Sequence, residues 1–228
     1  MSLASNIGSA TISGKTWLVT GAARGLGLCL VRHLSAQGAR VLALSRAPGL
    51  VMPGVTHIPY DQADETSINA AAQAVSGQID YVIHNAAIRG DTGGLATLTA
   101  SDLAAVIRIN VAGPLLLTRA LIPHLSPGAT LAFISSRAGS FTEGRDSDGD
   151  YAYCLSKAAL NRAVAKLADD LPFRVLALHP GWLRTEMGGD QAPEDPDDAA
   201  ARILSLLAGP KGPVSGSFAD SHGKLIQP

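Results

Sequence analysis

Short apolar runs alternate with longer segments of helical spacing along almost the whole chain. In the first repeat, an apolar run precedes a segment in which Leu26, Leu30 and Leu34 recur on one helical face. The same pattern predicts strands over 16–20, 41–45, 55–60, 79–84, 130–135, 173–179 and 215–219. It predicts helices over 25–37, 65–75, 99–125, 151–169 and 197–207. Strand–helix–strand repeats of this kind predict an α/β fold, namely a single doubly wound Rossmann-type domain whose parallel sheet is flanked by helices on both faces.

The irregular segments indicate the domain limits and the ligand-binding edge. Residues 1–15 are rich in Ser, Gly and Ala, and we expect them to form a loose extension before a single domain over 16–228. Pro114 lies inside the long predicted helix and should kink it or mark a seam. The polar, turn-rich segments 141–150 and 188–196 follow predicted strands, so they are expected at the carboxyl edge of the sheet, where ligands bind in such folds.

Composition narrows the classes of partner. The chain of 228 residues is 46% apolar and 16% charged, with a formal net charge of −1, which is typical of a globular protein. No long basic run indicates nucleic acid or an anionic membrane, and no apolar stretch is expected to cross a bilayer. The N-terminus does not resemble a signal peptide, so the cytoplasm is the expected location. No His, Cys or Asp residues have the spacing of metal ligands, so no metal site is expected.

A glycine-rich turn joins the first predicted strand to the first predicted helix. It contains Gly21, Gly25 and Gly27. Glycines let the backbone turn tightly and approach a ligand closely, and the N–H groups at a helix N-terminus favour a phosphate. The placement of the turn therefore favours a dinucleotide pyrophosphate over a purely structural role.

The end of the second predicted strand bears on which dinucleotide binds. An acid there would hydrogen-bond the adenosine ribose and favour NAD, but this chain has Ser45 and Arg46. A guanidinium binds phosphate in a bidentate manner, and Arg24 in the glycine-rich turn adds a second positive charge. We therefore expect NADP(H) to be preferred, with NAD(H) possible. The alternative is that both arginines are merely solvated.

A tyrosine and a lysine share one face of a strongly predicted helix. Tyr153 and Lys157 are spaced i, i+4, and the ammonium is expected to lower the pKa of the phenol from its usual value of about 10. Such a phenol can donate a proton to a carbonyl oxygen or accept one from an alcohol. Ser136 follows an apolar strand and can hydrogen-bond the same oxygen. Asn110 either holds a water that connects to Lys157 or caps a kink at Pro114.

Together these motifs resemble the short-chain dehydrogenase/reductase family, and the resemblance covers about 16–223. The matching motifs occur in the family's order: the glycine-rich turn at 20–27, the segment 84–87, the tetrad Asn110, Ser136, Tyr153 and Lys157, and the segment 179–181 followed by Thr185. Within the family, the stretches 135–140, 149–161 and 179–189 look like the carbonyl-reductase/C-factor-like branch.

The resemblance implies an NADP(H)-dependent oxidoreductase that interconverts a small carbonyl compound and an alcohol, and that forms a homodimer or homotetramer. It makes Tyr153 the acid/base, and it makes Lys157 the residue that lowers the pKa of Tyr153 and binds the nicotinamide ribose. Ser136 would orient the substrate oxygen, and Asn110 would anchor a proton-relay water. Asp61 would contact adenine, and Thr185 the nicotinamide carboxamide. The implied cofactor-binding residues are Gly21, Ala23, Arg24, Gly25, Leu26, Gly27, Ser45, Arg46, Asp61, Gln62, Asn85, Ala86, Ala87, Tyr153, Lys157, Pro180, Gly181, Trp182, Leu183 and Thr185.

Three features depart from the family's pattern. His84 replaces the usual first Asn of its motif, and we expect it to make a structural hydrogen bond. Ala87 replaces a Gly and would shift the backbone if that position had a positive φ. The interval from Ser136 to Tyr153 is longer than usual, and we expect the extra residues to bulge over the site and to leave the tetrad intact.

Other functions compete with that of a reductase. Ser136 lacks the G-x-S-x-G setting of a hydrolase nucleophile. The main alternative is a family member that binds NADP without catalysis, as a regulator or redox sensor, although the complete tetrad argues against it. A third is an epimerase or dehydratase that uses a transient keto intermediate. The loops 90–98, 141–150 and 188–196 identify no substrate by composition, but the short polar region after Pro180 favours a small or polar carbonyl.

Overall fold

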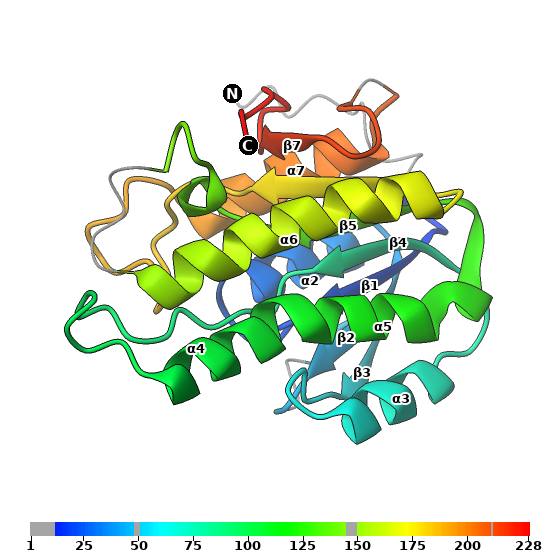
Figure 1. Ribbon diagram of the computed structural model, residues 1–228. Helices are drawn as coiled ribbons and strands as arrows, with labels where there is room; N and C mark the ends of the chain where they lie inside the picture. Colours follow the sequence, from blue (N-terminus) through cyan, green and yellow to red (C-terminus); the bar gives the residue numbers. More distant parts are fainter. Residues whose placement is uncertain (1–11, 48–50, 145–149, 211) are drawn as a thin grey trace.

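The computed structural model describes residues 12–47, 51–144, 150–210 and 212–228. Its centre is a sheet of seven parallel strands in the order β3-β2-β1-β4-β5-β6-β7 (Figure 1). The strands are β1 (Thr16–Thr20), β2 (Arg40–Ser45), β3 (Val55–Pro59), β4 (Ile79–His84), β5 (Leu125–Ile134), β6 (Arg174–His179) and β7 (Phe218–Asp220). The strand order reverses between β1 and β4, and ligands bind near such a point at the carboxyl edge.

Helices cover both faces of this sheet (Figure 1). On one face lie α2 (Gly25–Ala36) and α7 (Pro196–Ala208), and on the other lie α3 (Glu65–Gln73), α4 (Ala100–Ile107), α5 (Gly113–Leu121) and α6 (Tyr151–Asp170). Successive residues of a strand point to opposite faces: Leu18 joins the core under α3, α5 and α6, and Val19 joins the core under α2 and α7. The prediction of a doubly wound Rossmann-type sheet is confirmed.

The start of the domain is anchored before β1. Of the extension predicted over 1–15, residues 1–11 lie outside the described residues. Ile12 is buried in the core under α2 and α7. Lys15 forms an ion pair with Asp80 (3.0 Å), whose carboxylate also accepts a hydrogen bond from the Thr16 N–H (3.0 Å).

The long helix predicted over 99–125 is interrupted just before Pro114, as the presence of the proline predicts. A π-helical turn spans Arg108–Ala112, between α4 and α5. A proline in a helix has no N–H and crowds the carbonyl of the preceding turn, and a wider turn accommodates it. Asn110 lies within this turn, so the seam sets the position of a predicted site residue.

A glutamine side chain completes the hydrogen bonding of the π turn. The Gly113 N–H bonds to the Arg108 carbonyl, five residues back. In this register the Ile109 carbonyl would need an N–H from Pro114, which has none. It accepts instead from Gln62 Nε2 (2.7 Å). A Cβ at Gly113 would overlap Gln62, so only glycine permits this approach.

The prediction that the helix continues to residue 125 is wrong. α5 ends at Leu121, a 3₁₀ turn covers Ile122–His124, and β5 begins at Leu125 rather than at 130. Pro123 cannot continue an α-helix, and Leu125 pairs with Ile79 of β4 in the sheet. The predicted edge strand over 215–219 is present as β7, although it is shorter and begins later.

One helical stretch bears on the expectation that no segment crosses a bilayer. By length and hydropathy alone, Ala100–His124 is long and apolar enough to cross a bilayer. A helix that covers a buried sheet has the same composition, and here Leu117 and Leu121 pack in the core under α3, α5 and α6. Less than half of the stretch is buried within the chain.

Candidate active site

The glycine-rich turn has the geometry of an anion cradle. Gly21 and Gly25 have positive φ values of 67° and 52°, which L side chains rarely adopt. A Cβ at Gly27 would overlap the Gly21 carbonyl, so the third glycine lets α2 pack against the turn. The first turn of α2 contains no acidic residue, and its N-cap residue, Arg24, makes no side-chain capping hydrogen bond. The first N–H groups of α2, which include that of Leu26, are therefore available for a phosphate, as is the backbone of Ala23 just before the helix.

The segment after β4 is fastened to this turn. Asn85 Nδ2 donates to the Thr20 carbonyl (2.9 Å), and the N–H groups of Asn85 and Ala86 both donate to Thr20 Oγ1 (3.0 Å each). Ala87 has no positive φ, so the replacement of glycine at this position causes no backbone strain. The two predicted cofactor segments are thus brought together at the carboxyl edge of β1 and β4.

His84 makes the expected structural hydrogen bond. Its Nε2 lies 2.9 Å from Thr118 Oγ1, and its ring stacks on Phe133. Complete burial lowers the pKa of His84 to about 3, so the ring is neutral at ordinary pH. His84 Nδ1 has no partner among the residues that the structure describes.

The residues predicted to bind the adenosine phosphate differ in their exposure and in their partners. Ser45 is buried and donates to the Ala47 carbonyl (2.6 Å), while Arg46 is exposed. Arg24 is exposed as well and forms an ion pair with Glu186. Both guanidinium groups are thus accessible from solvent.

Asp61 and Gln62 differ in how their side chains are used. The Asp61 carboxylate accepts from the Ala63 N–H (2.9 Å) and is only half-buried. Gln62 is buried, and its Nε2 donates to the carbonyls of Ala86 (2.9 Å) and Ile109 (2.7 Å). The Gln62 side chain therefore links the segment after β4 to the π turn, which leaves its backbone for any contact with a cofactor.

Tyr153 and Lys157 project from the first turns of α6. Lys157 Nζ lies 5.4 Å from the centre of the Tyr153 ring and donates to the Ile134 carbonyl (2.8 Å). Burial raises the pKa of Tyr153 to about 12, and a hydrogen bond with the Ser136 side chain acts in the opposite direction. Burial also lowers the pKa of Lys157 to about 7. The expected lowering of the Tyr153 pKa by Lys157 is therefore wrong for this structure: desolvation dominates, and the positive charge that opposes it is that of Arg89.

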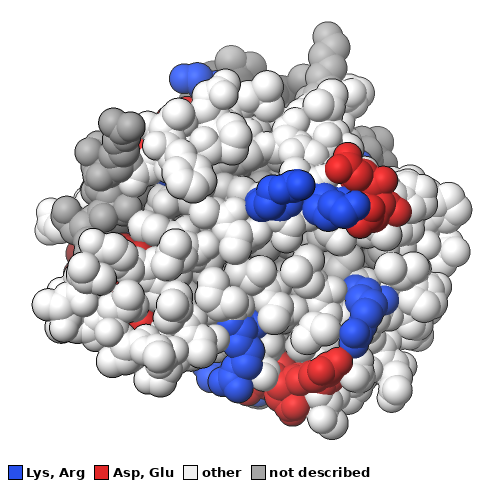
Figure 2. All heavy atoms as spheres, viewed as in Figure 1, with Lys and Arg blue, Asp and Glu red and all other residues white. Residues whose placement is uncertain are grey.

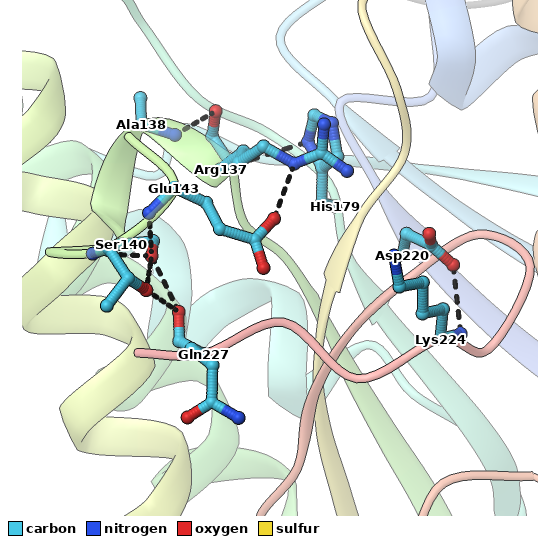
Figure 3. A network of polar contacts seen from close by, with 10 residues as sticks. Arg137, Ala138, Ser140, Glu143, His179, Asp220, Lys224 and Gln227 are labelled. Carbon is cyan, nitrogen blue, oxygen red and sulfur yellow. Dashed lines mark hydrogen bonds and ion pairs between the residues drawn. The ribbon is translucent and has the colours of Figure 1, made fainter. Parts of the chain in front are cut away.

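Ser136 begins a short segment that is braced at both ends, and Figure 3 shows its continuation from Arg137 to Glu143. Ser136 Oγ accepts from the Ala138 N–H (3.2 Å), and the Arg137 N–H donates to His179 Nδ1 (3.3 Å). Further along, Ser140 Oγ donates to the Gln227 carbonyl near the C-terminus (2.6 Å). Residues 145–149 of the long interval before Tyr153 lie outside the described residues, but the Ser136 side chain lies close enough to Tyr153 to lower the pKa of its phenol.

Asn110 is buried and its side chain is fully engaged. Oδ1 accepts from the Ile88 N–H (2.9 Å), and Nδ2 donates to the Ile88 carbonyl (2.8 Å) and to Ser156 Oγ (3.0 Å). The side chain therefore ties the segment after β4 to α6. Its backbone carbonyl is the group that remains for a relay water.

The loop after β6 closes the site from the other side. Gly181 has a φ of 103°, Leu183 is buried, and Pro180 is half-buried. Trp182 is mostly exposed and donates from Nε1 to the Gly188 carbonyl (2.8 Å). Thr185 lies against Gly25, so the loop reaches the glycine-rich turn.

A polar cavity of about 330 Å³ lies beside this loop. Figure 3 shows three of its lining residues, Arg137, His179 and Asp220, at the carboxyl ends of β5, β6 and β7. Burial lowers the pKa of His179 to about 4, and its Nδ1 accepts a backbone N–H. The neutral ring therefore carries its proton on Nε2.

Sequence reasoning missed one pair at this site. Arg89 donates to the buried carboxylate of Asp150 from Nε (2.9 Å) and NH2 (2.7 Å), and its charge lowers the pKa of Tyr153. Nothing in the spacing could show that these two residues meet. Within the described ranges, no group of His, Cys, Asp and Glu is arranged to hold a metal.

Comparison with known proteins agrees with this geometry. The short chain dehydrogenase family matches residues 15–196. The C-signal protein of Myxococcus xanthus is 38% identical over 68% of this chain and 96% of its own length. A 1-hydroxy-2-glutathionyl-2-methyl-3-butene dehydrogenase of a Rhodococcus species is 32% identical over 93% of this chain and 99% of its own length.

Solved structures resemble the whole domain. An NADPH-bound carbonyl reductase from chicken fatty liver is 28% identical, with a TM-score of 0.86 over 94% of each chain. A carbonyl reductase from Pseudomonas aeruginosa is 30% identical, with a TM-score of 0.81 over 93% of this chain and 99% of its own. The match over most of the chain, together with the tyrosine, lysine and serine at the carboxyl edge, shows that this chain belongs to the short-chain dehydrogenase family of oxidoreductases.

Proposed function

We propose that the protein is an NADP(H)-dependent carbonyl reductase that converts a ketone or aldehyde to an alcohol, or runs the reverse reaction. The observation that carries this proposal is that the Ser136 side chain and a buried Lys157 both lie close to the Tyr153 ring. The NADPH-bound carbonyl reductase among the similar structures supports it. We also propose the cytoplasm as its location.

The residues present fit a dinucleotide. The uncapped N-terminus of α2 and the turn at Gly21 and Gly25 would hold the pyrophosphate, and Asp61 would reach the adenine. Asn85 to Ala87, Lys157 and the loop from Pro180 to Thr185 would border the ribose and nicotinamide. When bound, the nicotinamide supplies the hydride that reduces the carbonyl carbon.

Tyr153 supplies the proton. A pKa of about 12 keeps its phenol protonated at neutral pH, which is the state that a donor to a carbonyl oxygen requires. The carbonyl gains a hydride at carbon and a proton at oxygen, so one NADPH and one proton are consumed for each alcohol formed. Ser136 orients the oxygen, and protonated Lys157 stabilises the phenolate that remains.

The preference for NADP(H) rests on accessible guanidinium groups. Arg46 follows Ser45 at the end of β2 and is exposed, and no acid occupies this position. Arg24 would add positive charge at the turn. The 2′-phosphate of NADP(H) would therefore lie near a positive charge, whereas the ribose hydroxyls of NAD(H) would have no carboxylate to accept their hydrogen bonds.

We also propose that the protein forms a homodimer or homotetramer through α5 and α6. The charged side chains visible on that face lie over the second half of α6, at the C-terminal end of α5, near the junction of α4 and α5 and near α3, and the strip between α5 and α6 is uncharged (Figure 2). Leu155 of α6 is half-exposed, and the helical stretch from Ala100 to His124 is less than half buried. A second copy of this chain would cover that apolar surface.

Tyr153→Phe is expected to fold and bind NADPH but to lose about 100-fold or more in kcat, because the proton donor is gone. NADPH oxidation would be followed across aldehydes, ketones, diketones and quinones. Tyr151→Phe, two residues earlier on the same helix and exposed, should keep full turnover. Undiminished turnover of the Tyr153 variant would refute its role.

Lys157→Met is expected to change how stability depends on pH. The pKa of Lys157 falls from 10.5 to about 7 on folding, so between these values the unfolded chain carries a proton that the folded chain lacks. The free energy of unfolding should therefore rise with pH across this window, by up to about 1.4 kcal/mol per pH unit, and the variant should lose that rise. Urea unfolding of the cofactor-free protein at pH values from 7 to 9.5 measures it, with exposed Lys166→Met as control. Equal slopes would contradict the assignment.

Arg46→Ala is expected to weaken NADPH binding about tenfold or more, because a hydrogen-bonded charge on the 2′-phosphate is lost. NADH binding should change little. Titration of cofactor fluorescence with the purified protein gives both dissociation constants. Arg32→Ala, exposed on α2, is the control. Equal weakening of both cofactors would show that Arg46 does not read the phosphate.

Light scattering should give the mass of a dimer or a tetramer. Leu155→Glu places a charge on the proposed contact and should shift the protein towards monomer. Leu225→Glu, exposed on the C-terminal segment, should leave the mass unchanged. A monomeric wild-type protein at working concentration would rule out the pairing.

A further inference from the structure

The ion pair between Arg89 and Asp150 joins three segments around Tyr153. Arg89 lies in the segment after β4, and Asp150 immediately precedes α6, three residues before Tyr153. Nε and NH2 of Arg89 hold the Asp150 carboxylate at 2.7–3.1 Å. NH1 faces the carbonyl of Met187, in the loop after β6. The guanidinium therefore lies where the three loops meet beside the proposed proton donor.

The carboxylate of Asp150 binds Arg89 and does not cap the N-terminus of α6. An aspartate at a helix start normally accepts hydrogen bonds from the N–H groups of its own first turn. Asp64 does so for α3 and Asp195 does so for α7. Asp150 makes no such capping bond, and its carboxylate is buried beneath Arg89. The Asp150 carboxylate therefore holds the Arg89 guanidinium in place, and the N-terminus of α6 is left without a side-chain cap.

The remaining edge of the guanidinium is available to a ligand. Nε and NH2 are satisfied by Asp150, whereas NH1 lies 3.5 Å from the Met187 carbonyl, which is at the limit of hydrogen-bond length. The Arg89 side chain is 42% exposed, and its charge acts on Tyr153, so the guanidinium is both near the proposed proton donor and open to solvent. Because Asp150 balances the charge of Arg89, the edge offers a hydrogen-bond donor with little net attraction for an anion.

We propose that Arg89 is a substrate-positioning residue that selects carbonyl compounds with a second, neutral oxygen on the adjacent carbon, such as vicinal diketones. This inference rests on the proposed function. The carbonyl to be reduced lies between the hydroxyls of Ser136 and Tyr153, and the second oxygen accepts from Arg89 NH1. A neutral oxygen binds more favourably than a carboxylate here. The Arg89–Asp150 ion pair has little net charge, so it cannot offset the free energy that desolvating a carboxylate costs.

The experiment compares matched ketones in one protein sample. The probes are biacetyl against butanone, and phenylpropanedione against propiophenone, with NADPH oxidation as the readout. The ratio of kcat/KM within each pair does not depend on the fraction of folded enzyme. Removing Arg89 alone would leave a buried, unpaired carboxylate, so the test variant is the double substitution Arg89→Gln/Asp150→Asn. Lys166→Gln/Asp170→Asn removes an exposed ion pair at the far end of α6 and serves as the control.

The diketone preference of the wild type should fall about tenfold in the Arg89→Gln/Asp150→Asn variant, mainly through KM of the diketone, because one charge-assisted hydrogen bond is lost. The control variant should keep the wild-type ratio. An unchanged ratio in a variant that still reduces the monoketones would overturn the role of Arg89 and leave the reductase standing. If the wild type reduces none of the four compounds while NADPH binds, the proposed function and this inference fall together.

Discussion

Both faces of the parallel sheet are buried, and this constraint places every functional group at one edge. A parallel strand must be followed by a crossover, so each strand points its carboxyl end the same way. The glycine-rich turn after β1, the Asn85 segment after β4, Ser136 after β5 and the loop after β6 therefore meet without any sequence proximity. Hydrogen bonds such as those of Asn85 to Thr20 then fix the loops to one another.

Burial also sets the chemistry of this edge. Lys157 lies beneath Tyr153 with its ammonium on the Ile134 carbonyl, and desolvation moves the pKa values of the two groups apart, to about 12 for Tyr153 and about 7 for Lys157. Neutral Tyr153 and a lysine that titrates near pH 7 are suited to donate a proton and then to accommodate the phenolate. Asn110, held by Ile88 and Ser156, keeps α6 in place relative to the segment after β4.

Local patterns were sufficient for most of the fold, and the order of the motifs supplied the proposed tetrad. Apolar runs identified the buried strands, and the seam at Pro114 followed from its missing N–H. The sequence failed where tertiary contacts decide the outcome. Leu125 reads as helix by spacing but pairs with Ile79 in the sheet, and the Tyr153 pKa depends on a depth of burial that no spacing shows. Arg89 and Asp150 are far apart in the chain, and Asp150 looks like an ordinary helix cap.

The central claim is that the tetrad directs a hydride to a carbonyl carbon. The most direct measurement uses NADPH carrying deuterium at both positions of nicotinamide C4, with the product of a reactive ketone or aldehyde analysed by mass spectrometry. The account predicts one deuterium on the carbinol carbon for each NADPH consumed. Tight NADPH binding without deuterium in any product of a broad carbonyl panel would contradict it, and would favour a family member that binds the cofactor without catalysis.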